Sequence, residues 1–141
     1  MRIRFIINPI AGKGKQKGIE SEISKHFNNY DIFYTKKEGD ASIISKKAIS
    51  ENINAVIAVG GDGTLNECLK SLVNTTIALG VIPCGSGNGF AYHIGMSRNI
   101  KKATQQLKVA KIITVDSCTV NKMPFMNIAG IGFDAKRFFN N

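Results

Sequence analysis

Three glycine-rich segments hold the residues of this 141-residue sequence whose types and spacing are best suited to chemistry. They are residues 8–14 (NPIAGKG), residues 60–67 (GGDGTLNE) and residues 83–89 (PCGSGNG). Glycine lets backbone N–H groups approach an anion closely, and the N-terminus of a helix behind such a loop attracts negative charge. The three segments are therefore candidate phosphate-binding loops, although the first is explained equally well as a tight turn.

The second segment is the most informative, because it places the carboxylate of Asp62 among glycines that already suffice to turn the chain. At a helix N-terminus this carboxylate can cap backbone donors. It can also orient Mg²⁺ on nucleotide phosphates, since Mg²⁺ takes one or two carboxylates together with phosphate oxygens. In the third segment, the hydroxyl of Ser86 and the amide of Asn88 suit a phosphate or a substrate hydroxyl.

Short β-branched and apolar runs lead directly into the three loops, which is typical of parallel strands. The predicted strands are residues 2–7, 32–35, 55–59 and 77–82, and the predicted helices are residues 18–28, a helix from an N-cap at Asp40 toward Asn52, and a helix through Leu65, Leu69 and Leu72. The order βαβαβαβ predicts an α/β fold with an open, mostly parallel sheet covered by helices. Ligands bind outside the carboxyl ends of such strands, so we expect the three loops to converge.

The rhythm changes after residue 88. Short helices are predicted near residues 89–94 and 100–107, followed by two β-like runs at 111–120 and 125–133. The turn-rich residues 121–124 between them favour an antiparallel hairpin. We expect an α/β domain at residues 1–110 and the opening strands of an incomplete β-rich domain at 111–141. Because an isolated hairpin is marginal in water, we expect the chain to be part of a longer protein and its uncovered strands to self-associate.

Composition restricts the partners. Nineteen Lys and Arg against ten Asp and Glu give a net charge of +9, which calls for an anionic substrate or partner. The basic residues are scattered, aromatic residues are 8% and tryptophan is absent, which disfavours nucleic acid. We predict no transmembrane helix and no secretion signal. Three widely spaced cysteines fit neither a disulfide framework nor a zinc site, which indicates a reducing cytoplasm.

Five motifs in order resemble the diacylglycerol kinase catalytic-domain family, which includes sphingosine and other long-chain-base kinases. They are Asn8-Pro9-x-Ala11-Gly12, Thr35 with Gly39-Asp40-Ala41, residues 60–67, Pro83-x-Gly85-Ser86-Gly87-Asn88, and residues 127–135 (NIAGIGFDA). The resemblance implies a Rossmann-like nucleotide-binding domain, ATP and Mg²⁺ as cofactors, and transfer of the γ-phosphoryl group to a lipid hydroxyl in phospholipid biosynthesis. The acceptor would be diacylglycerol or a long-chain base, and Ser86 with Gly89 looks more like the long-chain-base kinases.

The resemblance also implies a set of site residues. Asp62 would be catalytic, organising the phosphates and magnesium. The nucleotide site would comprise Asn8, Pro9, Ile10, Ala11, Gly12, Thr35, Gly61, Asp62, Gly63, Thr64, Leu65, Asn66, Glu67 and Ser86. The family's general base lies beyond residue 141, so we expect this chain alone to be inactive. The enzyme would be cytoplasmic and peripheral to the membrane, where its lipid substrate lies and where anionic lipids attract its basic residues.

Two alternatives stay open. An NAD kinase-like phosphotransferase resembles the chain in the second loop, but not in the first or the third. A non-catalytic nucleotide-binding module would share the loops without transferring phosphate. Lys13, Lys15 and Lys17 beside the first loop suit either phosphate attraction or an ordinary solvated face. Cys68 and Cys84 are predicted to be small buried apolar side chains rather than nucleophiles.

Overall fold

Four strands form one parallel sheet in the computed structural model, which describes residues 1–126. The strands are β1 (Ile3–Ile7), β2 (Tyr30–Tyr34), β3 (Ala55–Gly60) and β4 (Ala78–Pro83), in the order β2-β1-β3-β4. The two central strands, β1 and β3, are buried along their whole length, as expected of strands covered on both faces. The predicted open parallel sheet is confirmed.

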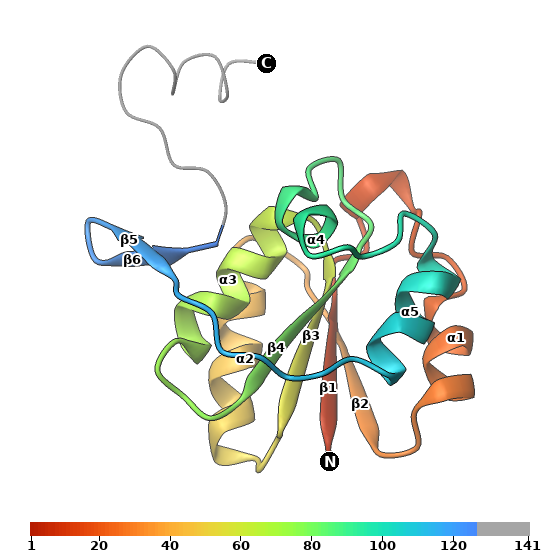
Figure 1. The fold of residues 1–141 in the computed structure, drawn as a ribbon, viewed down its shortest axis with the longest axis horizontal. Coiled ribbons are helices and arrows are strands. Elements are labelled where there is room, and N and C mark those ends of the chain that lie inside the picture. Colours follow the sequence, from red (N-terminus) through yellow and green to blue (C-terminus); the bar gives the residue numbers. More distant parts are fainter. Residues whose placement is uncertain (127–141) are drawn as a thin grey trace.

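Five α-helices accompany the sheet within residues 1–126, besides a short 3-10 helix at Ala11–Lys13. They are α1 (Ile19–His26), α2 (Asp40–Ser50), α3 (Asp62–Leu72), α4 (Gly89–His93) and α5 (Ile100–Lys108). Figure 1 shows α1 and α5 on one face of the sheet and α2 and α3 on the other. Their order along the chain is the predicted one, and their ends differ from the predicted ends by a few residues.

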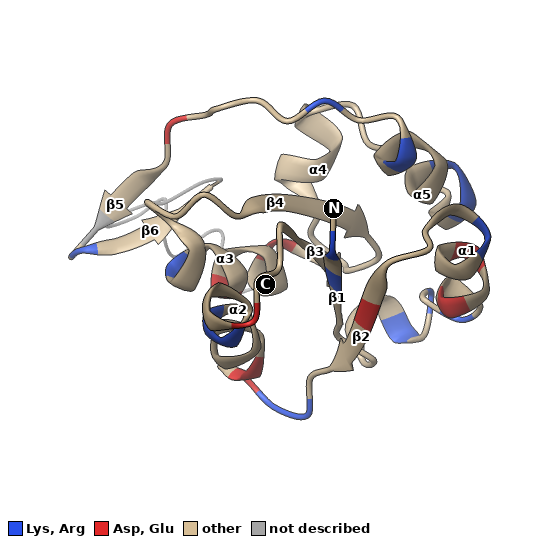
Figure 2. Ribbon diagram, turned by 90° about the horizontal axis from the view of Figure 1, so that it is seen from below, with Lys and Arg blue, Asp and Glu red and all other residues tan. Residues whose placement is uncertain are grey.

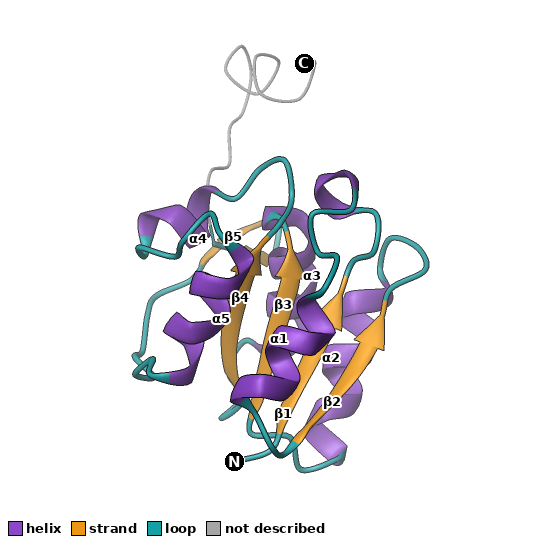
Figure 3. Ribbon diagram, turned by 90° about the vertical axis from the view of Figure 1, so that its right-hand side faces the viewer, coloured by secondary structure: helices purple, strands orange, loops and turns teal. Residues whose placement is uncertain are grey.

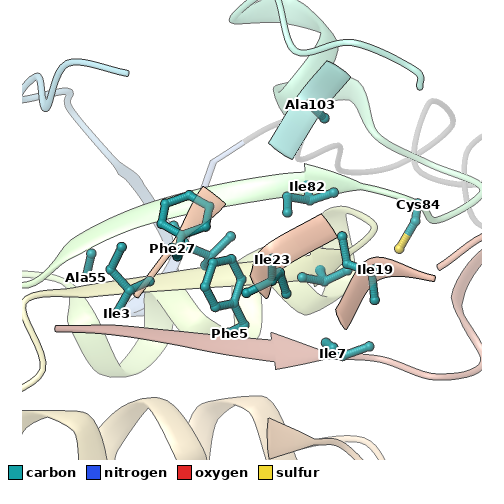
Figure 4. Close-up of a cluster of buried hydrophobic side chains, with 12 residues drawn as sticks. Ile3, Phe5, Ile7, Ile19, Ile23, Phe27, Ala55, Ile82, Cys84 and Ala103 are labelled. Carbon is teal, nitrogen blue, oxygen red and sulfur yellow. The ribbon is translucent and has the colours of Figure 1, made fainter. Parts of the chain in front are cut away.

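Two apolar layers hold the helices to the sheet. On the α1 and α5 face, the ring of Phe5 lies 5.3 Å from that of Phe27 in an edge-to-face arrangement, and Ile23 packs beside them (Figure 4). On the opposite face, Leu65 and Cys68 of α3 pack with strand residues that include Ile6 and Val56. Successive side chains of β1 and β3 point alternately into the two layers. Both faces of these strands are therefore apolar, which is why their sequences are continuous apolar runs.

One charged side chain, Arg4, lies fully buried within β1. Its guanidinium donates two hydrogen bonds to Asp31 at 2.8 and 2.9 Å and one to Glu51 at 2.5 Å, and it stacks 4.3 Å from the ring centroid of Phe33. The hydrogen bond to Asp31 is the largest cause that raises the pKa of Arg4 above its ordinary value. The paired carboxylates make this burial tolerable.

The N-terminus of α2 differs from the prediction. Gly39, with φ of +88°, occupies the N-cap position, and Asp40 is the first residue of the helix. The carboxylate of Asp40 instead accepts hydrogen bonds from the backbone N–H groups of Lys36 and Lys37, at 2.7 and 3.0 Å, and these bonds lower its pKa. The donor that an N-cap would satisfy, the N–H of Ala41, bonds Glu67 at 3.2 Å. The predicted N-cap role of Asp40 was therefore wrong.

An antiparallel hairpin is present in the predicted region, but its first strand is shorter than predicted, and Met123 and Pro124, predicted as part of the turn, belong to its second strand. β5 (Cys118–Val120) pairs with β6 (Met123–Phe125) in antiparallel register. The connection is two residues long, Asn121 and Lys122, both with positive φ as a tight hairpin turn requires. Residues 111–117, predicted as strand, are irregular because no strand within residues 1–126 pairs with them. The predicted run at 125–133 and the motif at 127–135 lie outside the described residues beyond position 126.

The hairpin lies beside α3, on the side away from α1 and α5 (Figure 1). Just after β6, the backbone N–H of Met126 donates to the side-chain oxygen of Asn66 in α3 at 3.0 Å. Helix α5 ends at Lys108, close to the predicted domain boundary, and the division into two domains stays a prediction. Basic segments are spread over α1, α2, α5 and the β5–β6 turn (Figure 2). Across the described part of the chain, every helix is too short or too polar to span a bilayer.

Candidate functional site

The three glycine loops meet at one end of the sheet, where all four strands finish (Figure 3). β1 and β3 are neighbours, yet the chain leaves β1 for a helix on one face and leaves β3 for a helix on the other. This divergence is the topological switch point at which open α/β sheets bind ligands. The backbone N–H of Asn8 donates to the carbonyl of Val59 across it at 3.0 Å.

Glycine is required here because the loops pack backbone against backbone. A Cβ atom at Gly12 would lie 1.8 Å from the carbonyl oxygen of Cys84 in the third loop. A Cβ atom at Gly61 would lie 2.7 Å from the carbonyl oxygen of Gly87, and one at Gly85 would lie 2.5 Å from the Cα of Gly61. The third loop therefore touches both of the others, and the predicted convergence is confirmed.

Asp62 joins the second and third loops. Its backbone N–H donates to the carbonyl of Gly87 at 2.9 Å. One carboxylate oxygen accepts from the N–H of Gly89 at 2.9 Å, and the other accepts from the N–H of Phe90 at 3.3 Å. Asp62 begins α3, but the donors that it satisfies belong to the start of α4.

Asn88 fixes the shape of the third loop. Its side-chain oxygen accepts from the N–H of Gly85 at 3.0 Å, while its amide donates to the carbonyl of Gly85 at 2.7 Å and to the hydroxyl of Tyr92 at 3.1 Å. Asn88 is buried, whereas Ser86 is exposed. The amide predicted to face a phosphate is thus used inside the loop, and only the Ser86 hydroxyl is presented to solvent.

Several implied nucleotide-site residues line the junction of the loops. The side-chain amide of Asn8 lies 3.4 Å from the hydroxyl of Thr64, and its oxygen accepts from the N–H of Ile10 at 3.2 Å. The backbone N–H of Thr35 donates to the carbonyl of Ile7 at 2.9 Å, which extends the pairing of β1 with β2 to the same edge. Pro9 and Ile10 are exposed and Ala11 is half-buried in the first loop.

Other implied residues have structural partners. Leu65 is buried in the layer between α3 and the sheet. Asn66 accepts from the N–H of Met126, and Glu67 accepts from the N–H of Ala41 at the start of α2. Gly63 is exposed in the first turn of α3. These contacts involve side chains far apart in the sequence, so sequence spacing alone could not assign them.

The basic strip beside the first loop is not uniform. Lys13, Lys15 and Lys17 are all exposed, but the Cδ atom of Lys15 lies 3.1 Å from where a Gly12 Cβ would be, beside the third loop. Burial raises the pKa of the Cys84 thiol to about 11, and the charge of Lys15 opposes that rise. Lys15 therefore lies over the junction of the first and third loops, which favours phosphate attraction for this lysine.

The two cysteines near the loops are buried, as predicted. Burial also raises the pKa of Cys68 to about 11. Both thiols are protonated near neutral pH, and a protonated thiol is a poor nucleophile and metal ligand. Gln16, two residues after the first loop, is buried and was not predicted as a site residue, because a lone glutamine between two lysines carries no motif.

The fold and the site define a parallel α/β protein whose candidate site is built from glycine loops at the topological switch point. The family described as the diacylglycerol kinase catalytic domain matches residues 2–120. The chain therefore belongs to this family of lipid kinases.

Relatives and solved structures agree with that assignment. The chain is 34% identical over 137 residues to a diacylglycerol kinase of Staphylococcus carnosus, covering 93% of this chain and 45% of the relative. It is 33% identical to a diacylglycerol kinase of Staphylococcus aureus strain JH9, with 93% and 44% covered. A crystal structure of a diacylglycerol kinase from Bacillus anthracis matches with a TM-score of 0.78 and 29% identity, covering 88% of this chain and 47% of that one. The chain thus spans less than half the length of these proteins.

Proposed function

We propose that this chain is the nucleotide-binding part of an ATP-dependent lipid kinase that transfers the γ-phosphoryl group to a lipid hydroxyl. One observation carries the proposal: three glycine loops meet at the switch point of a parallel sheet, with the Asp62 carboxylate between two of them. Phosphoryl transfer depends mainly on positioning and electrostatic stabilisation. A site made of loop backbone, one carboxylate and short polar side chains suits that chemistry.

The triphosphate of ATP would lie over the junction of the loops. The first loop contributes the backbone of residues 8–12, and Lys15 supplies a positive charge beside it. The exposed hydroxyl of Ser86 would reach the same space from the third loop. Gly12 and Gly61 allow the loop backbones to touch, and backbone N–H groups brought together in this way can bind an anion.

Magnesium fits the donors at this junction, which are the hard oxygen ligands that it prefers. Asp62 would hold the ion through its carboxylate. A magnesium ion held there would neutralise charge on the phosphates. Within residues 1–126, no three His, Cys, Asp or Glu side chains gather as a metal cage.

The lipid acceptor would be diacylglycerol or a long-chain base. The family resemblance puts the general base beyond residue 141, so we propose that this chain binds Mg-ATP without phosphorylating a lipid. Such an acceptor lies in a membrane leaflet, and a net charge of +9 draws the protein to anionic lipids by roughly 1 kcal/mol per basic residue at the surface. The protein would work at the cytoplasmic membrane surface. Sedimentation with anionic vesicles at low and high salt tests this: binding that salt does not weaken, or no binding, contradicts it.

Calorimetric titration of the 141-residue chain with ATP, with and without Mg²⁺, tests the proposed function. We expect weak binding that requires Mg²⁺ and no product with diacylglycerol or sphingosine. Failure to bind Mg-ATP contradicts the nucleotide site. Measurable lipid phosphorylation contradicts the placement of the base outside the chain.

A further inference from the structure

A buried polar side chain that no motif explains, Gln16, lies between the first loop and α1. Gln16 is 8% exposed, although both of its neighbours, Lys15 and Lys17, are exposed. Its side-chain amide donates a hydrogen bond to the carbonyl of Pro9, seven residues earlier. The backbone carbonyl of Gln16 accepts from the N–H of Ile19, the first residue of α1, at 3.0 Å. Gln16 therefore ties the beginning of the loop to the beginning of the helix.

The stretch that this contact closes is conformationally demanding. Gly12, Lys13 and Gly14 have φ of +58°, +56° and +86° in succession. The left-handed region is unfavourable for a lysine, and such backbone persists only where the surroundings determine it. The hydrogen bond from Gln16 to Pro9 spans these three residues, so it is well placed to hold them.

The oxygen of the same side-chain amide is unfavourable for stability. This atom, Oε1, is buried and has no hydrogen-bond partner within the described part of the chain. An unsatisfied buried acceptor destabilises a fold, and an apolar side chain of similar length avoids that cost. Stability therefore does not account for a glutamine at this position, whereas the geometry of the loop does.

We infer that Gln16 is a positioning residue for nucleotide binding, and this inference rests on the proposed function. The side-chain amide of Gln16 fixes the Pro9 carbonyl by its hydrogen bond. This contact keeps the backbone of residues 8–12 in the conformation that binds the phosphates. Lys15, the neighbour of Gln16, is oriented over Gly12 by the same segment. Gln16 itself contacts no phosphate.

The test compares Gln16→Met with the wild type in the 141-residue chain, measuring the Kd for Mg-ATP by calorimetry and the Tm by thermal denaturation. Misplacement of the loop is expected to raise the Kd about tenfold or more, while the Tm stays level or rises because the buried oxygen is gone. A matched control is Gln106→Met. Gln106 also braces a loop, donating to the carbonyl of Gly95 at 2.9 Å and accepting from the N–H of Ser97 at 2.7 Å, so its loss should lower the Tm and leave the Kd unchanged.

A second variant, Gln16→Glu, keeps the shape and removes the donor. Its carboxylate cannot donate to Pro9 near neutral pH, but its protonated form can. The Kd relative to wild type should therefore be raised at pH 7.5 and fall as the pH is lowered toward the ordinary pKa of a glutamate carboxyl, about 4.3. A Gln16→Met chain whose Kd is unchanged, with or without a lower Tm, overturns the inference while the wild type still binds Mg-ATP. A wild type that does not bind Mg-ATP overturns the proposed function, and the inference with it.

Discussion

Replacing Asp62 by Asn separates the two roles open to this carboxylate, which are capping the start of α4 and holding Mg²⁺. Asn keeps the shape of the side chain and one acceptor oxygen, but it puts an NH₂ group where the second oxygen accepts a backbone N–H. The bonds at stake include those from the N–H groups of Gly89 at 2.9 Å and Phe90 at 3.3 Å. The substitution therefore weakens the link between the second and third loops without emptying the space between them.

The size of the stability effect follows from those contacts. Losing one hydrogen bond to a charged acceptor costs about 1.5 kcal/mol. Losing the negative charge at a helix N-terminus costs about 0.5 kcal/mol more. For a chain of this length, about 2 kcal/mol corresponds to a Tm lower by roughly 6–8 °C. The protein should stay folded at 25 °C, since domains are typically stable by about 5–15 kcal/mol.

The nucleotide effect should exceed what this loss of stability explains. If Asp62 also holds Mg²⁺, the Kd of the folded variant for Mg-ATP should rise at least tenfold, about 1.4 kcal/mol. In the full-length enzyme, activity should be abolished. Calorimetry at 15 °C, where the variant is folded, measures the Kd, and thermal denaturation measures the Tm.

Asn99→Ala is the control for Asp62→Asn, because the side chain of Asn99 caps α5 by accepting from the N–H of Lys102 at 3.1 Å. It should lower the Tm and leave the Kd unchanged. Asp62→Asn with a lower Tm and an unaltered Kd would refute the magnesium role. Full-length activity within about tenfold of wild type, roughly 1.4 kcal/mol of barrier, would likewise make Asp62 a cap alone.

Three further predictions concern the scaffold. Arg4→Met should lower the free energy of unfolding in urea by about 2 kcal/mol, which is less than for a fully buried ion pair because Asp31 and Glu51 are 24% and 44% exposed. The control is Arg2→Met, which removes a half-exposed partner of the same Asp31 and should cost under about 1 kcal/mol. Equal costs for the two variants would argue against the buried network. Backbone donors lower the pKa of Asp40, and Lys25 lowers the pKa of Glu22. Both carboxylates therefore contribute stability that is present above their ordinary pKa values and is lost as the pH falls through their lowered pKa values. A Tm that stays constant from pH 5 to pH 2 would contradict this. Ile112 and Ile113 are each 71% exposed beside a groove of about 600 Å³ along the edge strand β4. The 141-residue chain should therefore self-associate, whereas a version that ends at residue 111 should not. Light scattering that shows a stable monomer of the 141-residue chain at high concentration would disprove this prediction.

The sequence predicted the sheet and the convergence of the loops for a physical reason. Strand runs such as residues 2–7 and 55–59 lead directly into glycines, and the carboxyl ends of parallel strands share one edge. Those features are local in sequence, so their periodicity and turn chemistry are readable. The burial of Cys68 and Cys84 was predictable for the same reason, since both adjoin apolar runs without a cation beside them in sequence.

Two of the misses involve partners that are distant along the chain. Asp62 caps a helix that begins 27 residues later, and the start of α2 is bonded by Glu67, 26 residues from Ala41, and not by Asp40. Asn88 turns inward for a local reason, because its side chain bonds the backbone of Gly85 and so holds the third loop. Residues 111–117 have a strand-like pattern, but a strand also needs a partner, which no pattern within the segment reveals.

The central claim, that the three loops form one Mg-ATP site, is tested most directly by backbone amide NMR during a titration with Mg-ATP. We predict shift changes concentrated in residues 8–14, 60–64 and 83–89, with the α2 and β2 amides little affected. The changes should disappear when EDTA removes the metal. An unchanged spectrum, or changes concentrated away from these loops, would contradict the account.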